Sequence, residues 1–311
     1  MKLNELYDQY ESGALDKHGY IEAMHKKHAV LFEYFDYLKD TDIESITIEN
    51  DQIFATMKDT GIKLYLDPHD SRFIPIEILN FKSFDPVERD LIFSLARKSE
   101  TIFDIGANIG WYTLNFCKLE NVESVHAFEP IPRTFDYLSR HVAFNACDKA
   151  VLNNIALSNE NGEMEFFWNK KETGSSSMRN IQEREDSSSV TCRLRTLDDY
   201  AQETGVHIDM IKCDVEGSEL LVFQGGLTTI ERDKPYIFTE MLRKWSAKFG
   251  YHPNDIINLL SEIGYQCFAY VDQKFETIDV VTPETEPTNF FFLHRDHHTD
   301  IIKQNLHGDK G

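Results

Sequence analysis

The stretch TIFDIGANIGWYT, residues 101–113, decides the fold because an apolar strand runs into a turn of small residues and then into a helix. Small residues in such a turn let backbone N–H groups approach a ligand closely. A dinucleotide-binding turn would carry glycine where this chain has Asn108 and Trp111. Because Trp111 is too bulky for the helix–strand packing of that glycine, the turn favours a cofactor without a pyrophosphate. An ordinary tight strand-to-helix turn is the alternative.

Strands and helices alternate from this turn onward. The strands following TIFDIG include SVHAFEP, VLNNIALS, IDMIKCDV and YIFTEM. Repeated strand–helix units imply a parallel sheet with helices on both faces. The last two strands, YQCFAYVD and NFFFLHR, have no helix between them, which predicts an antiparallel hairpin at the sheet edge. The predicted fold class is therefore α/β, with a Rossmann-like, mostly parallel sheet.

A different organisation precedes this unit. Residues 1–40 carry apolar stripes at helical spacing, which predicts helices. In ITIENDQIFATM and IKLYL, apolar and polar residues alternate with period two around a turn at 58–61, which predicts a β-hairpin. FDPVERDLIFSLARK predicts a helix with Asp85 as its N-cap. We divide the chain into a helical and β-hairpin lead-in, a catalytic domain and a polar, frayed tail, over residues 1–95, 96–296 and 297–311.

The composition limits the partners of the chain. Its 53 Asp and Glu against 32 Lys and Arg give a formal charge of -21, which disfavours nucleic acid. The five cysteines form no C-x-x-C pair and predict reduced thiols in a cytoplasmic protein, not a disulfide or zinc site. No apolar run approaches the roughly 18 residues of a membrane helix. His25 and His28 share a helix face, but nothing completes a metal site there.

Carboxylates end two of the predicted strands. Glu129 follows the second strand, where a carboxylate accepts the ribose hydroxyls of a nucleoside or a dinucleotide. Asp214, Glu216 and Glu219 converge on the turn after the fourth strand, at the same sheet edge. We expect Lys212 to pair with Asp214, and Glu219 to complement a helix N-terminus.

The blocks FDPVERDL, DIGANIGWYT, HAFEPIPRTFDYLSRHVAFN, VTCRLRTLDDY and IKCDVEGSELLVFQGG occur in this order within residues 60–242. Together they resemble the FkbM family of methyltransferases. The resemblance implies a class I methyltransferase fold, S-adenosylmethionine (SAM) as cofactor, and methyl transfer to an oxygen, commonly a hydroxyl of a sugar, glycan or natural product. The helical segment at the N-terminus is not part of this pattern.

Site residues also follow from the resemblance. It implies a cofactor site made of Asp104, Gly106, Ala107, Asn108, Gly110, Glu129, Ala156, Leu157 and Ser158. It places Asp214 near the methionine amino group or the reacting centre. It implies that Ser175, Ser176 and Ser177 line a mobile substrate loop.

Methyl transfer to an alcohol is an in-line displacement that a general base assists. We predict Asp214 or Glu216 as the base, with Glu240 orienting the acceptor. These acids could also compose a Mg²⁺ site, but we expect no metal requirement.

Two other functions stay open, an NAD(P)-dependent oxidoreductase and a non-catalytic nucleoside-binding module. An amino-methyltransferase of nucleic acid is disfavoured by the acidic charge. The acceptor and a homo-oligomer through the N-terminal helices also stay open.

Overall fold

The strand–helix alternation builds one large sheet. The computed structural model describes residues 2–169, 172–177 and 188–306. Side chains are described for all of these residues except those within 167–188. Within these residues, eight strands pair in the order β14-β13-β15-β12-β11-β4-β5-β6. They are β4 (Thr101–Ile105), β5 (Ser124–Phe128), β6 (Ala150–Asn153), β11 (Met210–Cys213), β12 (Tyr236–Glu240), β13 (Tyr265–Val271), β14 (Lys274–Thr277) and β15 (Asn289–His294).

The strands from β12 to β6 run parallel, whereas β15, β13 and β14 pair antiparallel. The chain runs outward from β4 to β6 and returns to β11 on the other side of β4. The strand order therefore reverses beside β4, where open α/β sheets bind ligands. The predicted α/β class and its antiparallel strand pair are confirmed. However, β15 lies inside the sheet, and the edge strand is β14, which the sequence did not predict.

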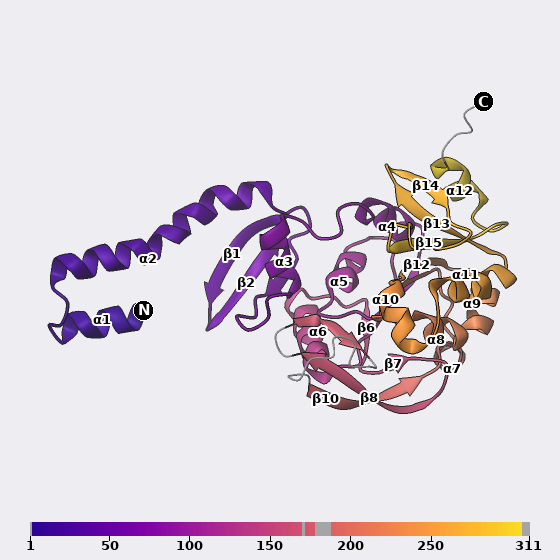
Figure 1. The fold of residues 1–311 in the computed structure, drawn as a ribbon, viewed down its shortest axis with the longest axis horizontal. Coiled ribbons are helices and arrows are strands. Elements are labelled where there is room, and N and C mark those ends of the chain that lie inside the picture. The colour runs from indigo at the N-terminus through magenta and orange to yellow at the C-terminus, as the bar shows by residue number, and fades with distance from the viewer. Residues whose placement is uncertain (1, 170–171, 178–187, 307–311) are drawn as a thin grey trace.

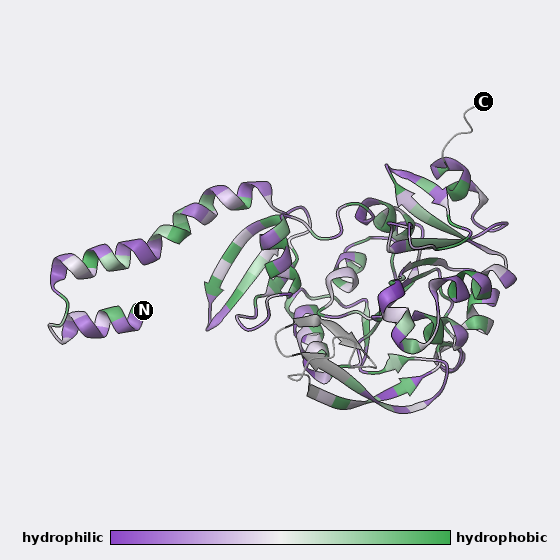
Figure 2. Cartoon of the chain, in the orientation of Figure 1, coloured by the Kyte–Doolittle hydropathy of each residue, from purple (hydrophilic) through white to green (hydrophobic). Residues whose placement is uncertain are grey.

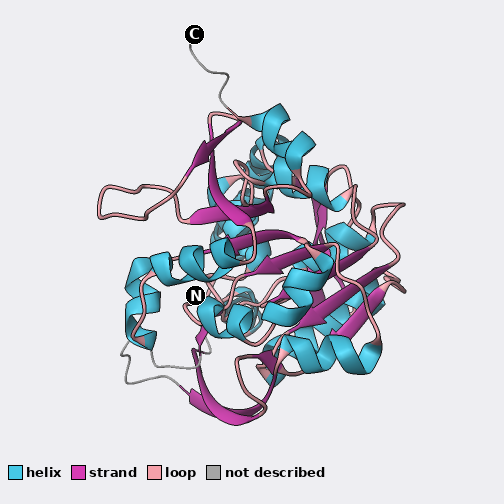
Figure 3. Ribbon diagram, turned by 90° about the vertical axis from the view of Figure 1, so that its right-hand side faces the viewer, coloured by secondary structure: helices cyan, strands magenta, loops and turns pink. Residues whose placement is uncertain are grey.

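Helices cover both faces of this sheet (Figure 3). Successive residues of β15 enter opposite cores, because Phe290 and Phe292 pack in one cluster and Phe291 and Leu293 in the other. This two-sided burial explains the continuous apolar run NFFFL. The helices after β4 are α5 (Trp111–Cys117), α6 (Pro132–Phe144), α7 (Leu197–Thr204), α8 (Glu219–Gln224), α9 (Leu227–Asp233), α10 (Arg243–Ser246), the 3₁₀ helix η2 (Ala247–Phe249), α11 (Pro253–Glu262) and α12 (Thr299–Asn305). Among the described residues, no helix is long and apolar enough to cross a membrane.

A smaller sheet follows β6, with strand order β7-β10-β8-β9. Its strands are β7 (Ala156–Leu157), β8 (Gly162–Asn169), β9 (Glu172–Ser177) and β10 (Ser188–Arg195). The predicted strand VLNNIALS is wrong as one element. The side chain of Asn154 donates to the carbonyls of Glu129 and Pro130, and the chain leaves the main sheet there. Ser175, Ser176 and Ser177 lie in strand β9 and not in a loop, because their backbone pairs with β8, and their side chains lie outside the described residues.

The N-terminal segment begins with a helical hairpin of α1 (Leu3–Glu11) and α2 (Lys17–Tyr37), which projects from the body (Figure 1). The 3₁₀ helix η1 (Leu38–Asp40) leads into three antiparallel strands, β1 (Ile43–Glu49), β2 (Gln52–Met57) and β3 (Lys63–Tyr65). The sequence predicted one hairpin, but ITIENDQIFATM is itself two strands. Asn50 and Asp51 turn the chain with φ of 48° and 61°, a left-handed conformation that these residue types tolerate.

The lead-in shares a hydrophobic core with the sheet unit. One cluster contains Ile43, Leu64 and Ile78 together with Val125 and Phe291. Two further helices, α3 (Ile74–Phe81), which was not predicted, and α4 (Arg89–Ala96) complete the segment. Asp85 is not the N-cap as predicted. Glu88 occupies that position, and the carboxylate of Asp85 instead accepts a hydrogen bond from the hydroxyl of Tyr112 at 2.7 Å.

The C-terminal tail was predicted to be frayed, but α12 is an ordered helix. Ile301 and Ile302 are buried in the same core as the lead-in. Two apolar residues in a polar stretch gave too weak a helical pattern to predict this.

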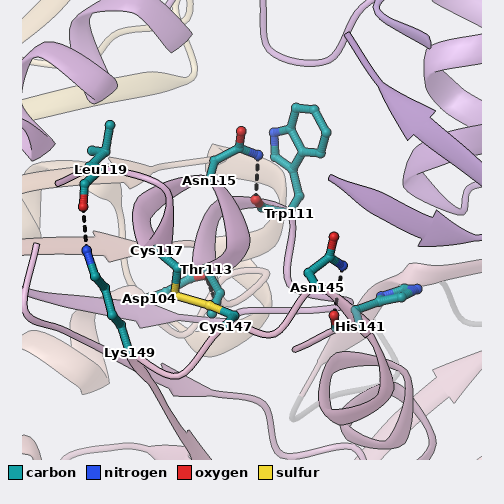
Figure 4. Close-up of a disulfide and its surroundings, with 10 residues drawn as sticks. All are labelled: Asp104, Trp111, Thr113, Asn115, Cys117, Leu119, His141, Asn145, Cys147 and Lys149. Carbon is teal, nitrogen blue, oxygen red and sulfur yellow. Dashed lines mark hydrogen bonds between the residues drawn. A yellow bond between two sulfur atoms is a disulfide. The ribbon is translucent and has the colours of Figure 1, made fainter. Parts of the chain in front are cut away.

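Cysteines of distant segments form a disulfide, so the prediction of five reduced thiols is wrong. Cys117 at the end of α5 and Cys147 after α6 are bonded, with their Cα atoms 6.2 Å apart (Figure 4). Thirty residues separate them, and no spacing pattern marks the pair. Cys192, Cys213 and Cys267 are free and buried.

We expect Cys147→Ser to lower the free energy of unfolding by about 2–4 kcal/mol, because the bond restricts the unfolded chain. Urea denaturation under oxidising conditions measures the loss. Cys192→Ser is the control for replacing a buried sulfur, and reductant should destabilise that variant but not Cys147→Ser. An unfolding curve of the parent that ignores reductant would contradict the disulfide.

Candidate active site

The turn after β4 approaches the end of β11 so closely that only glycine fits. Gly106 has φ of 76°, and a Cβ there would lie 1.8 Å from the carbonyl oxygen of Asp214. The N–H groups of Gly106 and Ala107 both donate to the carbonyl of Phe128 at 3.0 Å. This turn therefore meets the ends of β5 and β11 without an intervening side chain.

A buried ionic network supports the turn from below. The ammonium of Lys212 donates to the carbonyl of Gly106 at 2.8 Å and lies 3.3 Å from the carboxylate of Asp104. Asp104 also accepts from the hydroxyl of Thr113 at 2.6 Å. Burial opposes the charge of Lys212, but Asp104 and Asp214 raise its pKa above the usual value. The predicted Lys212–Asp214 pair is present at 3.9 Å, longer than the Lys212–Asp104 pair.

Glu129 lies at the end of β5 with 6% of its surface exposed. One carboxylate oxygen accepts from the N–H of Asn108 at 3.1 Å and the other from the N–H of Ile131 at 2.9 Å. Burial raises the pKa of Glu129 to about 7, against the effect of these hydrogen bonds. Each oxygen has a further lone pair available for a hydroxyl group.

The Gly106 turn, Lys212 and Glu129 line one cleft. The predicted site residues on its wall are Gly106, Ala107, Asn108, Glu129, Ala156, Leu157, Asp214 and Glu216. Four predicted residues do not line it. Asp104 lies beneath the turn, where it binds Thr113, and Gly110 is the N-cap of α5. Ser158 is buried, and its backbone N–H donates to the carbonyl of Arg195 in β10. Glu240 ends β12.

Sequence reasoning missed a second wall of the cleft. Ile74, Phe84 and Asp85 of the lead-in line it, together with Trp111 and Tyr112 of α5. The Phe84 and Trp111 rings meet edge to face at 5.8 Å. The block FDPVERDL in the family resemblance was a signal for this wall, but we used it only to predict a helix.

The acidic side chains of the turn after β11 differ in their surroundings. Glu219 accepts from the N–H groups of Val215 and Gly217 and from the hydroxyl of Tyr251, so it stabilises its own turn as expected. Burial and the neighbouring Asp214 raise the pKa of Glu216 well above its usual value. Burial and Asp214 likewise raise the pKa of Glu240 to about 9. Within the described part of the chain, no three His, Cys, Asp or Glu side chains are arranged to hold a metal ion.

The strand order, its reversal beside β4 and the cleft at that point define a class I methyltransferase fold. A model of the methyltransferase FkbM domain matches residues 104–267, more than half of the 311 residues. The chain therefore belongs to the FkbM methyltransferase family, and its cofactor is SAM.

Two solved structures are similar in part. The FkbM methyltransferase from Methylobacillus flagellatus KT has 18% identity over 62% of this chain, with a TM-score of 0.40, and the chain spans 43% of that structure. A putative methyltransferase from Streptococcus mutans, in complex with SAH, has 8% identity over 66% of this chain and 96% of its own, with a TM-score of 0.38. No curated protein gives a match.

The residues of the cleft fit this cofactor. The backbone of Gly106 lines the cleft without a side chain, and the side-chain oxygen of Asn108 is buried there with no hydrogen-bond partner among the described residues. Glu129 offers its carboxylate at the strand end where a ribose is recognised.

We expect Glu129→Ala to weaken SAM binding by about 1.5–3 kcal/mol, because two hydrogen bonds to a charged group are lost. Calorimetric titration with SAM and SAH measures the change. Glu129→Gln keeps the size of the side chain and isolates its charge. Glu262→Gln, at an exposed position of α11, is the control that should bind like the parent. Binding of NAD without binding of SAM or SAH would contradict the site.

Proposed function

We propose that this protein is a SAM-dependent O-methyltransferase acting on a hydroxyl of a sugar, glycan or natural product. The observation that carries the proposal is the composition of one cleft. The cleft lined by the Gly106 turn and Glu129 is also lined by Asp85, Asp214 and Glu216. Carboxylates are suited to accept the proton that a hydroxyl loses on methylation.

SAM supplies a methyl group on a positively charged sulfur, which is already activated for transfer. In our proposal Glu129 binds the ribose, the Gly106–Asn108 backbone the methionine part, and Ala156 and Leu157 the adenine edge. Asp214 is proposed to lie near the methionine ammonium or the reacting centre. The main contribution of the chain is alignment of the two reactants, which can lower the barrier by several kcal/mol.

A carboxylate that holds the hydroxyl proton adds roughly 10²–10⁴-fold. The sequence pattern predicts Asp214 or Glu216 as this general base, with Glu240 orienting the acceptor. Asp214 and Glu216 lie on the cleft wall, and Glu240 ends the neighbouring strand β12. The role of Ser175, Ser176 and Ser177 toward the substrate stays a prediction.

Two other functions compete with this proposal. An oxidoreductase would need room for a pyrophosphate, and Trp111 occupies the position of the third glycine and is packed against Phe84. A non-catalytic nucleoside-binding module would not require several acids on the cleft wall beside Glu129. Both observations support the methyltransferase.

We expect the protein to transfer the methyl group of methyl-labelled SAM to one or more of a panel of pyranosides and phenols, and to form an ether that resists mild base. Because no metal is needed in this proposal, turnover should persist in EDTA. Complete loss in EDTA with recovery on adding Mg²⁺ would overturn metal independence. Reduction of a carbonyl probe with NADH, without any methyl transfer, would support the oxidoreductase.

The N-terminal helices are also proposed to join two copies of the chain. No residue of α2 is buried, and hydrophobic residues occur along it between hydrophilic ones (Figure 2). Leu31, Phe32 and Phe35 are 60%, 69% and 71% exposed. Apolar surface of this kind on a projecting helix is typical of an interaction site.

The predicted cytoplasmic location stays a prediction. The disulfide between Cys117 and Cys147 removes the argument from reduced cysteines on which it was based.

We expect the joint change Leu31→Glu and Phe35→Glu to convert an oligomer into a monomer, because both residues lie on one helix face. Sedimentation equilibrium measures the mass. Phe81→Glu is the matched control, since Phe81 is 74% exposed but lies outside the helical hairpin. A parent protein that is already monomeric at micromolar concentration would rule out this interface.

A further inference from the structure

The cleft has a wall that the cofactor residues do not explain. It is built from the lead-in, which brings Phe84 against the ring of Trp111 and Asp85 against the hydroxyl of Tyr112. Two consecutive residues of one segment thus contact two consecutive residues of α5. Both pairs face the cleft.

Trp111 offers this wall an unused hydrogen-bond donor. Its side chain is 4% exposed, and its indole N–H is one of the few buried polar groups without a partner among the described residues. A buried donor without a partner is costly unless a ligand satisfies it. The indole N–H therefore points to a bound molecule that carries an acceptor oxygen.

Asp85 supplies the complementary acceptor. Its backbone has φ of 45°, a left-handed conformation that is uncommon for a residue other than glycine and that recurs at functional sites. The Tyr112 hydroxyl fixes one carboxylate oxygen at 2.7 Å. Burial raises the pKa of Asp85 to about 6, Asp214 and Glu88 add to this, and Tyr112 and Lys212 oppose it. Asp85 is thus ionised at neutral pH but close to its titration range.

The other acids of the cleft are less suited to accept a proton. The pKa of Glu216 is raised well above its usual value by burial and by Asp214, which favours the protonated form of this carboxyl. Asp214 lies 3.9 Å from the Lys212 ammonium, at the turn that meets the cofactor loop. A hydroxyl group needs both a donor and an acceptor beside it, and Trp111 and Asp85 provide this combination.

We propose that Asp85 is the catalytic base for methyl transfer, and that the indole N–H of Trp111 holds an oxygen of the same acceptor. As the carbon–oxygen bond forms, the methyl–sulfur bond breaks and its electron pair stays on sulfur. The hydroxyl proton moves to Asp85, which releases it to water. Tyr112 positions the carboxylate. This assignment rests on the proposed O-methyltransferase function.

The test measures transfer from methyl-labelled SAM to a mixture of methyl glucoside, galactoside, mannoside and rhamnoside from pH 5 to 9. In the parent the rate should rise with pH through about 6 as Asp85 loses its proton, and then level off. Asp85→Asn should lower the plateau by at least about 100-fold and abolish this rise. Tyr112→Phe should move the midpoint to higher pH, because a donor to the charged carboxylate is lost. Trp111→Phe should raise KM for the glycosides about fivefold with kcat nearly unchanged.

Glu88→Gln is the matched control, because Glu88 lies three residues after Asp85, binds Asn289 and does not line the cleft. It should keep the plateau rate. All variants should bind SAM like the parent, and weaker SAM binding by Trp111→Phe would assign its N–H to the cofactor and overturn that part. If the parent methylates a glycoside and Asp85→Asn keeps the rate and its pH dependence, the assignment of the base is wrong while the function stands. If the parent methylates none of the glycosides, the function and this assignment fail together for sugar acceptors.

Discussion

The cleft depends on the contacts that the ammonium of Lys212 makes with Asp104 and Gly106. The ammonium ties the ends of β4 and β11 together, since it lies 3.3 Å from the carboxylate of Asp104 and donates to the carbonyl of Gly106 at 2.8 Å. Removing one member of a buried ion pair typically costs about 3–5 kcal/mol, because the other charge is left uncompensated. The Gly106 turn is therefore held by a buried ion pair whose cation, Lys212, also lines the cleft.

A second set of contacts fixes the lead-in to this turn. The two ring nitrogens of His141 bind the N–H of Tyr65 in β3 and the carbonyl of Ile109 beside the turn, at 2.9 and 2.7 Å. A carbonyl only accepts, so Nδ1 carries the proton and Nε2 is the acceptor. Burial lowers the pKa of His141 to about 4, which keeps this neutral form at physiological pH. The carboxylate of Asp67, in the lead-in, also accepts hydrogen bonds from Arg133 and Tyr137 of α6.

The sequence pointed to the cleft residues that follow β4, β5 and β11 but not to those of the lead-in, and the reason is the range of the interactions. The Gly106 turn and Glu129 are encoded locally, by a strand that ends in small or acidic residues. Asp85 reaches Tyr112 across 27 residues, and Cys117 reaches Cys147 across 30, so neither partnership leaves a local pattern. Asp85 before a proline also matches a helix N-cap, and only the tertiary contact with Tyr112 distinguishes the two roles.

The domain that the family model matches holds only part of the cleft. The family match begins at residue 104, so it contains the cofactor turn and Glu129 but neither Phe84 nor Asp85. Carboxylates on the cleft wall raise one another's pKa, and a cationic cofactor relieves part of that repulsion. The repulsion reaches into the lead-in, because Asp214 also raises the pKa of Asp85. The cleft of this chain is therefore completed by a segment outside the matched domain, so the family match alone does not describe it.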